Sequence, residues 1–138
     1  MLEDWLAGVI DFNGHIGVRL GSRQLQPYIS IYSRKRENLE WLREIHPDFS
    51  LPILIGKRLF MSQIVSISGM RDLLSKLDGK LMILHRPAEL VLEFCNLRLE
   101  HSNESYNLRE LQLVAEVIKL TSRKSTLDQR LEALEQWV

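Results

Sequence analysis

The chain has 138 residues, of which 45% are hydrophobic and 26% are charged, so it is long enough for one domain with its own core. Its formal net charge of zero counts mildly against nucleic-acid binding, because nucleic-acid-binding domains are usually basic. No apolar run approaches the roughly 18 residues that cross a membrane, the acidic N-terminus is unlike a signal peptide, and the single cysteine cannot form an internal disulfide. These features predict a soluble intracellular protein, cytoplasmic or organellar.

Hydrophobic periodicity predicts alternating helices and strands along most of the chain. Residues 2–12 have helical periodicity, and residues 15–20 and 26–33 alternate polar and apolar side chains like the two strands of a hairpin. The later segments are predicted as a helix at 36–45, strands at 51–55 and 58–68, and helices at 70–78, 88–99, 108–120 and 125–137. A capping box at Ser125 is expected to open the last helix. This order is typical of an α+β fold with helices on one face of an antiparallel sheet.

Basic residues are concentrated in one part of the chain. Residues 15–68 contain eight Lys and Arg but only four Asp and Glu, and the C-terminal third is correspondingly acidic. This asymmetry favours one basic face on a neutral molecule. Simple solvation of a mixed surface explains the same pattern.

The segment LAGVIDFNG at residues 6–14 resembles the nine-residue signature of the LAGLIDADG homing endonucleases. The element order after the motif is similar to that of the family, and residues 29–36 and 87–93 resemble its second DNA-contacting strand and the start of a later helix. The resemblance covers the core of a single domain, about residues 2–100. The remaining segment, about residues 105–137, resembles the C-terminal helices that such proteins often add. It implies the αββαββα fold with an antiparallel, saddle-shaped sheet and extra C-terminal helices.

The first helix carries a flat strip at Ala7 and Gly8, and small residues of this kind let two helices approach closely. Because the chain has one motif, the resemblance implies an isologous homodimer in which this helix packs on its copy. The predicted interface consists of Leu6, Ala7, Gly8, Ile10 and Asp11. For the helix considered alone, ordinary core packing explains the same small residues.

The resemblance also implies that the outer face of the sheet reads a long, pseudo-palindromic double-stranded DNA site. With Ile16, Val18 and Ile29 facing inward, the side chains expected to face bases are His15, Gly17, Arg19, Arg23, Gln24, Gln26, Tyr28, Ser30 and Tyr32. Phosphate contacts, which position without specifying, are expected from Arg34, Lys35, Arg36, Lys57 and Arg58. Weaker candidates are Ser62, Ser66 and Ser68.

Position 13 departs from the family signature, because Asn13 stands where the second motif Asp is expected to bind Mg²⁺. An amide keeps an oxygen ligand but loses the charge that gathers Mg²⁺ and orients water. Weak metal binding at Asn13 and impaired phosphodiester cleavage are therefore expected. The resemblance gives the first motif Asp, Asp11, a mainly structural place, with help in holding a metal as the alternative role.

Other catalytic positions are also altered or ambiguous. Leu84 stands where the family often has a catalytic Lys, with His85 and Arg86 as nearby substitutes, although the favoured interpretation of His85 is a polar loop residue. Arg34 or Lys35 could order a catalytic water or contact phosphate.

Several interpretations stay open at this point. Asn13 belongs to a natural relative that no longer cuts, to an engineered inactive variant, or to an Asn-Gly pair that deamidates to Asp. A heterodimer with a related chain would restore one carboxylate. Other interpretations of the basic surface are an RNA-binding intron maturase, a domesticated DNA-binding regulator without nuclease activity, or a module that binds another protein.

Overall fold

The computed structural model describes residues 2–102 and 104–137. Within them, four antiparallel strands form one sheet in the order β1-β2-β4-β3. The strands are β1 (Gly14–Leu20), β2 (Leu25–Ser33), β3 (Ile53–Leu54) and β4 (Phe60–Ile64). The helices are α1 (Leu2–Asn13), α2 (Arg36–Ile45), α3 (Ile67–Lys76), α4 (His85–Glu100), α5 (Leu108–Thr121) and α6 (Lys124–Glu135). The predicted α+β fold, with its αββαββα order and added C-terminal helices, is confirmed.

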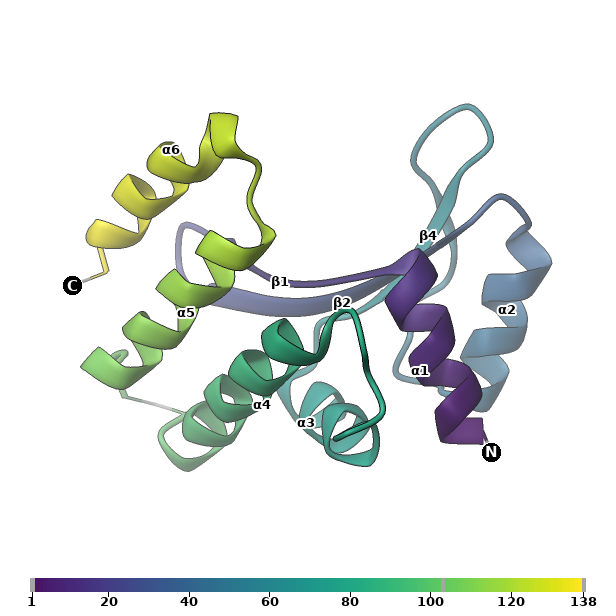
Figure 1. Ribbon diagram of the computed structural model, residues 1–138, viewed down its shortest axis with the longest axis horizontal. Helices are drawn as coiled ribbons and strands as arrows, with labels where there is room; N and C mark the ends of the chain where they lie inside the picture. Colours follow the sequence, from purple (N-terminus) through teal and green to yellow (C-terminus); the bar gives the residue numbers. More distant parts are fainter. Residues whose placement is uncertain (1, 103, 138) are drawn as a thin grey trace.

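The sheet curves across the middle of the molecule and leaves its concave side open (Figure 1). Helices α3, α4 and α5 lie beneath it, α1 and α2 lie at one end, and α6 lies at the other. The open side is flanked by α6 and by the loop between β3 and β4. None of the helices described here is long and apolar enough to cross a membrane.

The core fills the space between the sheet and the helices. Alternate strand residues point down into it, so Ile16, Val18 and Ile29 are fully buried while their neighbours face the concave side. Phe94 of α4 and Val114 of α5 are buried in the same cluster. The inward phase expected for the two hairpin strands is therefore observed.

Two predicted boundaries are wrong because capping side chains act elsewhere. The strand predicted at 58–68 ends at Ile64, because Ser66 accepts a hydrogen bond from Gly69 N at 3.2 Å and begins α3. The expected capping box at Ser125 is not formed, since α6 starts after Arg123 without a side-chain cap. A complete capping box opens α5 instead, where Asn107 and Glu110 bond each other's backbone N–H groups.

The C-terminal helices brace the β1–β2 hairpin from its outer edge. Arg130 of α6 donates to the Val18 carbonyl at 2.8 Å, and Tyr106 accepts a hydrogen bond from Leu25 N at 2.8 Å. Tyr106 is in turn held against Arg98, which pairs with buried Glu110 at 3.1 Å. These contacts hold the curved hairpin in place, and β1 is an edge strand that would otherwise leave its carbonyls unpaired.

Candidate nucleic-acid interface

The concave face of the sheet carries polar side chains from three neighbouring strands. Strand pairing sets His15 of β1 opposite Ser30 of β2, and Ser30 opposite Gln63 of β4. Four residues further along β1, Arg19 pairs with Gln26. Directly paired residues share a face, so these groups lie together although they are up to 48 positions apart in the sequence.

Arg19 is the charged centre of this face. Its guanidinium lies over the Tyr28 ring, 4.6 Å from the centroid, and donates to Gln63 Oε1 at 2.6 Å. Next to it, Gln24 donates to Gln26 Oε1 at 2.8 Å, and Gln26 donates to the Val65 carbonyl at 2.6 Å. Arginine and glutamine are the side chains that read guanine and adenine edges in the major groove.

His15 and Tyr28 form a second ordered pair on this face. Their rings stack with centroids 5.5 Å apart, and Tyr28 Oη lies 2.8 Å from His15 Nδ1. Burial, reinforced by the charge of Arg130, lowers the pKa of His15, and burial raises the pKa of Tyr28. Both groups are therefore uncharged at neutral pH, and the tautomer of the neutral imidazole sets which of the phenol and Nδ1 is the donor.

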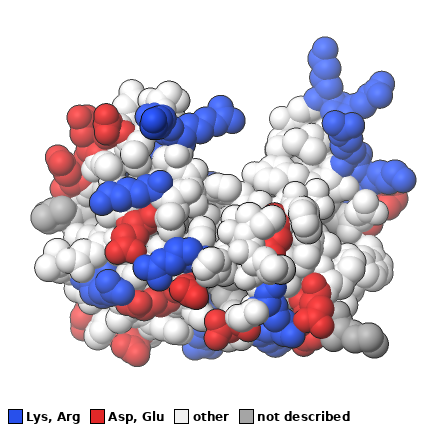
Figure 2. Space-filling model, viewed as in Figure 1, with Lys and Arg blue, Asp and Glu red and all other residues white. Residues whose placement is uncertain are grey.

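Basic side chains flank the concave face at both ends. Figure 2 shows a hollow with Lys and Arg at its two upper edges and mostly uncharged atoms between them. Arg23 lies in the β1–β2 turn, and Lys57 and Arg58 lie in the β3–β4 loop, all exposed. Arg34 and Lys35 are exposed between β2 and α2, while Arg36 pairs with Glu40 at 2.8 Å.

Some predicted contacts lie where they cannot meet a ligand. Ser30 is 0% exposed, because its short side chain lies between the longer His15 and Gln63 in the paired strands, and it is corrected as a DNA contact. Gly17 is also covered, since a Cβ there would lie 2.9 Å from Tyr28 Oη. Tyr32, in contrast, is half-buried on the concave side and keeps part of its surface accessible.

The predicted phase of the fourth strand is corrected as well. Ser62 pairs with Ile31 and points into the core, where it bonds the Ser50 carbonyl at 2.5 Å. Ser66 caps α3, and Ser68 belongs to that helix. The outward residue is Gln63, which sequence reasoning missed. The alternation of Ser62 and Ile64 around it was the available signal.

Asp11, at the end of α1, is bound to its own chain. Its carboxylate accepts backbone N–H groups from Met82 at 2.8 Å, Ile83 at 3.1 Å and Leu84 at 3.0 Å. These bonds fix the turn that begins α4, so Asp11 has the structural role that was expected. Asn13 lies two residues later and is exposed.

The face of α1 differs from the predicted dimer interface. Leu6, Ala7 and Ile10 are buried in the protomer's own core, because these positions face the sheet, and that placement is corrected. A Cβ added at Gly8 would meet open space. One turn later, Phe12 is 81% exposed.

The Asp11 turn adds to this exposed apolar surface, since Met82 is 82% exposed and Ile83 is 60% exposed. We call Phe12, Met82 and Ile83 the apolar end of α1.

The end of α1 does not fit a resident Mg²⁺. Magnesium is held by carboxylates with octahedral geometry, but three N–H groups already occupy Asp11 and the next ligand is the Asn13 amide. Across the part of the chain that is described, no three His, Cys, Asp or Glu side chains gather as a metal site. One protomer therefore offers an amide where metal-assisted hydrolysis needs charge.

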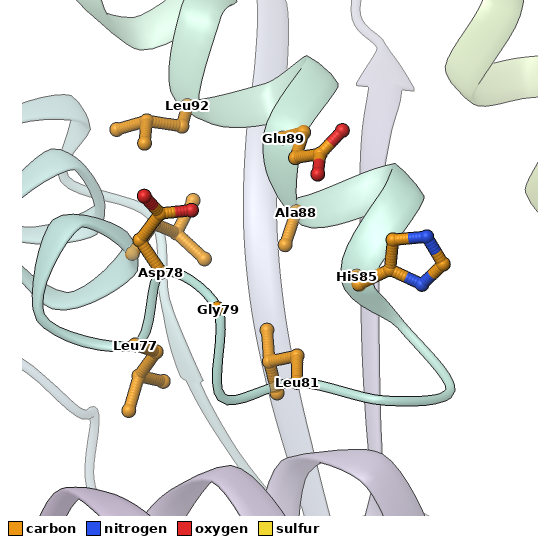
Figure 3. Close-up of a pocket in the computed structure, with 9 residues that line it drawn as sticks. Leu77, Asp78, Gly79, Leu81, His85, Ala88, Glu89 and Leu92 are labelled. Atoms are coloured by element: carbon orange, nitrogen blue, oxygen red, sulfur yellow. The ribbon is translucent and has the colours of Figure 1, made fainter.

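His85 and Arg86 directly follow the turn that Asp11 binds. His85 Nδ1 lies 3.1 Å from the Met82 carbonyl, and Arg86 pairs with Glu89 and Glu116, each at 3.3 Å. Figure 3 shows His85 at a separate cavity between the end of α3 and the start of α4, whose lining is largely leucine with Asp78 and Glu89. That cavity lies on the helical side of the sheet.

No protein-family profile and no curated protein matches the chain, but solved structures do. The homing endonuclease I-CvuI in complex with its target aligns at 19% identity and TM-score 0.76, covering 97% of this chain and 94% of that one. The archaeal intron-encoded homing endonuclease I-Vdi141I complexed with DNA aligns at 20% identity and TM-score 0.75, covering 99% and 96%.

A longer chain is also similar. The LAGLIDADG homing endonuclease I-SmaMI bound to cleaved DNA aligns at 17% identity and TM-score 0.69, covering 99% of this chain and 48% of that one. At these sequence identities the alignments show a shared architecture alone, and that architecture agrees over nearly the whole length of this chain. The chain therefore has the fold of the LAGLIDADG homing endonucleases.

Proposed function

We propose that the chain binds double-stranded DNA as a homodimer through the concave faces of its sheets, and that it cleaves the DNA poorly or not at all. The expected target is a long, pseudo-palindromic site, since an isologous dimer presents the same face twice. The observation that carries the proposal is the ordered group Arg19, Tyr28 and Gln63, which lies on an open face between basic edges.

The charge distribution supports a duplex ligand. Exposed cations at the two edges of the hollow suit the two phosphate backbones that border a major groove, while the middle offers amides, one guanidinium and aromatic groups suited to base edges. The neutral total charge is compatible with this arrangement, because residues 14–35 and 49–66, which form the strands of the sheet and their hairpin loops, contain no Asp or Glu.

The apolar end of α1 supports a dimer. Phe12, one turn after the open side of Gly8, and Met82, in the turn bound by Asp11, each expose most of their surface, and contact with a second α1 helix would cover both. The lengths agree, because the chain spans nearly all of I-CvuI and I-Vdi141I but about half of I-SmaMI. A chain of the I-SmaMI length has room for two such units.

Asn13 is the reason for expecting little cleavage. The dimer would bring two amides to its axis where the family resemblance implies two metal-binding carboxylates, so the charge that draws Mg²⁺ to the scissile phosphates would be missing. Arg34 and Lys35 are exposed near the end of β2 and would contribute phosphate contacts.

The test is fluorescence anisotropy of a mixed-sequence DNA duplex titrated with the protein at several salt concentrations, in calcium to suppress cleavage. Binding should weaken steeply with salt, and Lys57→Ala should lower the salt slope of the dimer by about two, one for each protomer. Lys76→Ala removes the same charge from α3, on the helical side, and should leave the slope unchanged.

Equal changes of the salt slope in the two lysine variants, or no binding at low salt, would contradict the DNA proposal. Tighter binding to an RNA duplex of the same sequence would favour the maturase alternative. Sedimentation of the free protein measures the dimer independently of DNA.

A further inference from the structure

Arg19 reaches across the whole width of β2. Strands β1 and β4 each pair with β2 and not with each other, and neighbouring strands lie about 4.8 Å apart. The Arg19 side chain nevertheless spans from β1 to Gln63 on β4, donating to its Oε1 at 2.6 Å. An extended, hydrogen-bonded arginine on an exposed surface has given up rotamer freedom before any ligand arrives.

The surface beneath Arg19 is built to hold it. The Tyr28 ring lies under the guanidinium, with the cationic carbon 4.6 Å from its centroid. His15 fixes that ring through a hydrogen bond between its Nδ1 and the Tyr28 hydroxyl, 2.8 Å away. Gly17 leaves the space in which the ring lies, because a Cβ there would come within 2.9 Å of Tyr28 Oη.

Arg19 is held without being neutralised. Other ordered arginines of the described chain, such as Arg86, Arg98 and Arg109, pair with carboxylates. No carboxylate of the described residues forms an ion pair with Arg19, and its partners are a neutral amide and an aromatic ring. The guanidinium therefore keeps its full charge for an external acceptor while its plane is fixed from two sides.

We propose that Gln63 is a positioning residue that aims Arg19 at one guanine in each half-site, an inference that rests on the proposed DNA binding. Guanine O6 and N7 accept two parallel N–H groups from one arginine, and this bidentate contact needs the plane of the fork to be correctly set. Gln63 accepts one of the five guanidinium N–H groups and leaves the others for the base. A glutamine that read a base itself would instead present its amide outward.

The test is selection of binding sites from a randomised duplex pool in calcium, followed by sequencing, for the wild type and four variants. Wild-type sites should contain a guanine at one position of each half-site, and Arg19→Ala should abolish that preference. Gln63→Leu should reduce the preference about tenfold at the same base pair. The double variant should be no worse than Arg19→Ala alone, because both residues act through one contact.

Gln63→Glu separates positioning from base contact. It restores an acceptor for Arg19, so the guanine preference should survive while the added negative charge weakens binding to every sequence. A change of preference at a different base pair in Gln63→Leu, or additive losses in the double variant, would overturn the proposal because Gln63 would then read its own base. An unchanged guanine preference in Gln63→Leu would overturn the proposal as well.

A DNA-free measurement separates this inference from the proposed function. Side-chain NMR of the arginine Nε–Hε groups should show Arg19 ordered in the free wild type and in Gln112→Leu, a remote variant on α5, but mobile in Gln63→Leu. A mobile Arg19 in the wild type overturns the positioning alone. Failure of every protein to enrich sites overturns DNA binding and, with it, guanine reading, even if Arg19 is ordered.

Discussion

The concave face of the sheet and the end of α1 both contain polar groups from the motif region and its surroundings, but the two regions are organised differently. On the concave face, Arg19, Tyr28 and Gln63 are ordered by one another and stay open to solvent. At the end of α1, Asp11 is saturated by backbone N–H groups, and Asn13 is exposed with an amide in place of a charge.

In the proposed function, this difference separates recognition from chemistry in one small domain. The face proposed to read DNA is complete within a protomer, because its groups come from three paired strands. The position proposed to hold a metal carries an amide in each protomer, and symmetry would repeat that amide in a homodimer. A protein of this design would bind and not cut, and the four predictions that follow test the two regions against each other.

The largest expected effect is at position 13. Asn13→Asp should raise magnesium-dependent cleavage of a selected site about 100-fold, because each protomer regains a carboxylate for the metal. Cleavage is measured as linear product against magnesium concentration. Asn13→Ala should bind DNA in calcium like the wild type and gain no activity. Efficient cutting by the unmodified protein would show that the amide suffices.

Asp11 should matter for folding where Asn13 does not. Asp11→Ala removes an acceptor from three backbone N–H groups, two of them on exposed residues that water can partly satisfy. The free energy of unfolding should fall by about 2–3 kcal/mol, measured by urea denaturation. For Asn13→Ala the change should stay within about 0.5 kcal/mol. Similar losses in both variants would contradict a structural role specific to Asp11.

Two glycines should respond in opposite directions. Gly17→Ala places a methyl group 2.9 Å from Tyr28 Oη, so displacement of the ring should cost about 1 kcal/mol of unfolding free energy and loosen Arg19. Gly8→Ala meets open space in a helix and should stabilise the protomer by about 0.5–1 kcal/mol. If α1 packs on its copy, the same change should weaken dimerisation in sedimentation. Stabilisation by both would show that the Tyr28 platform tolerates a side chain.

The smallest effect is the pH dependence contributed by His15. Its pKa in the folded protein lies below the ordinary 6.5, so the unfolded chain binds a proton that the folded chain resists. This contribution to stability is fully present above pH 6.5 and is lost as the pH falls through the lowered folded value. His15→Gln should reduce the loss of urea stability between about pH 7.5 and pH 5.5. His46, whose pKa is also lowered by burial, accounts for the remaining loss, and an unchanged pH profile would refute the role of His15.

Local patterns in the sequence predicted most of the architecture. The helix expected at 36–45 matches α2, and the inward phase of Ile16 and Ile29 is observed, because periodicity and burial are coupled within a single element. Prediction failed where one residue was compatible with two neighbouring elements. Ser66, for example, caps α3 instead of extending β4. Capping of this kind depends on geometry at the junction, which alternation alone does not encode.

The sequence by itself determined the fold, through the motif at residues 6–14 and the element order, and it showed an amide at Asn13, where the family resemblance implies a carboxylate. Only the tertiary structure decided which side chains are available. It placed Leu6 and Ile10 in the core and Gln63 beside Arg19, because burial and hydrogen-bond partners are set by residues distant in the chain.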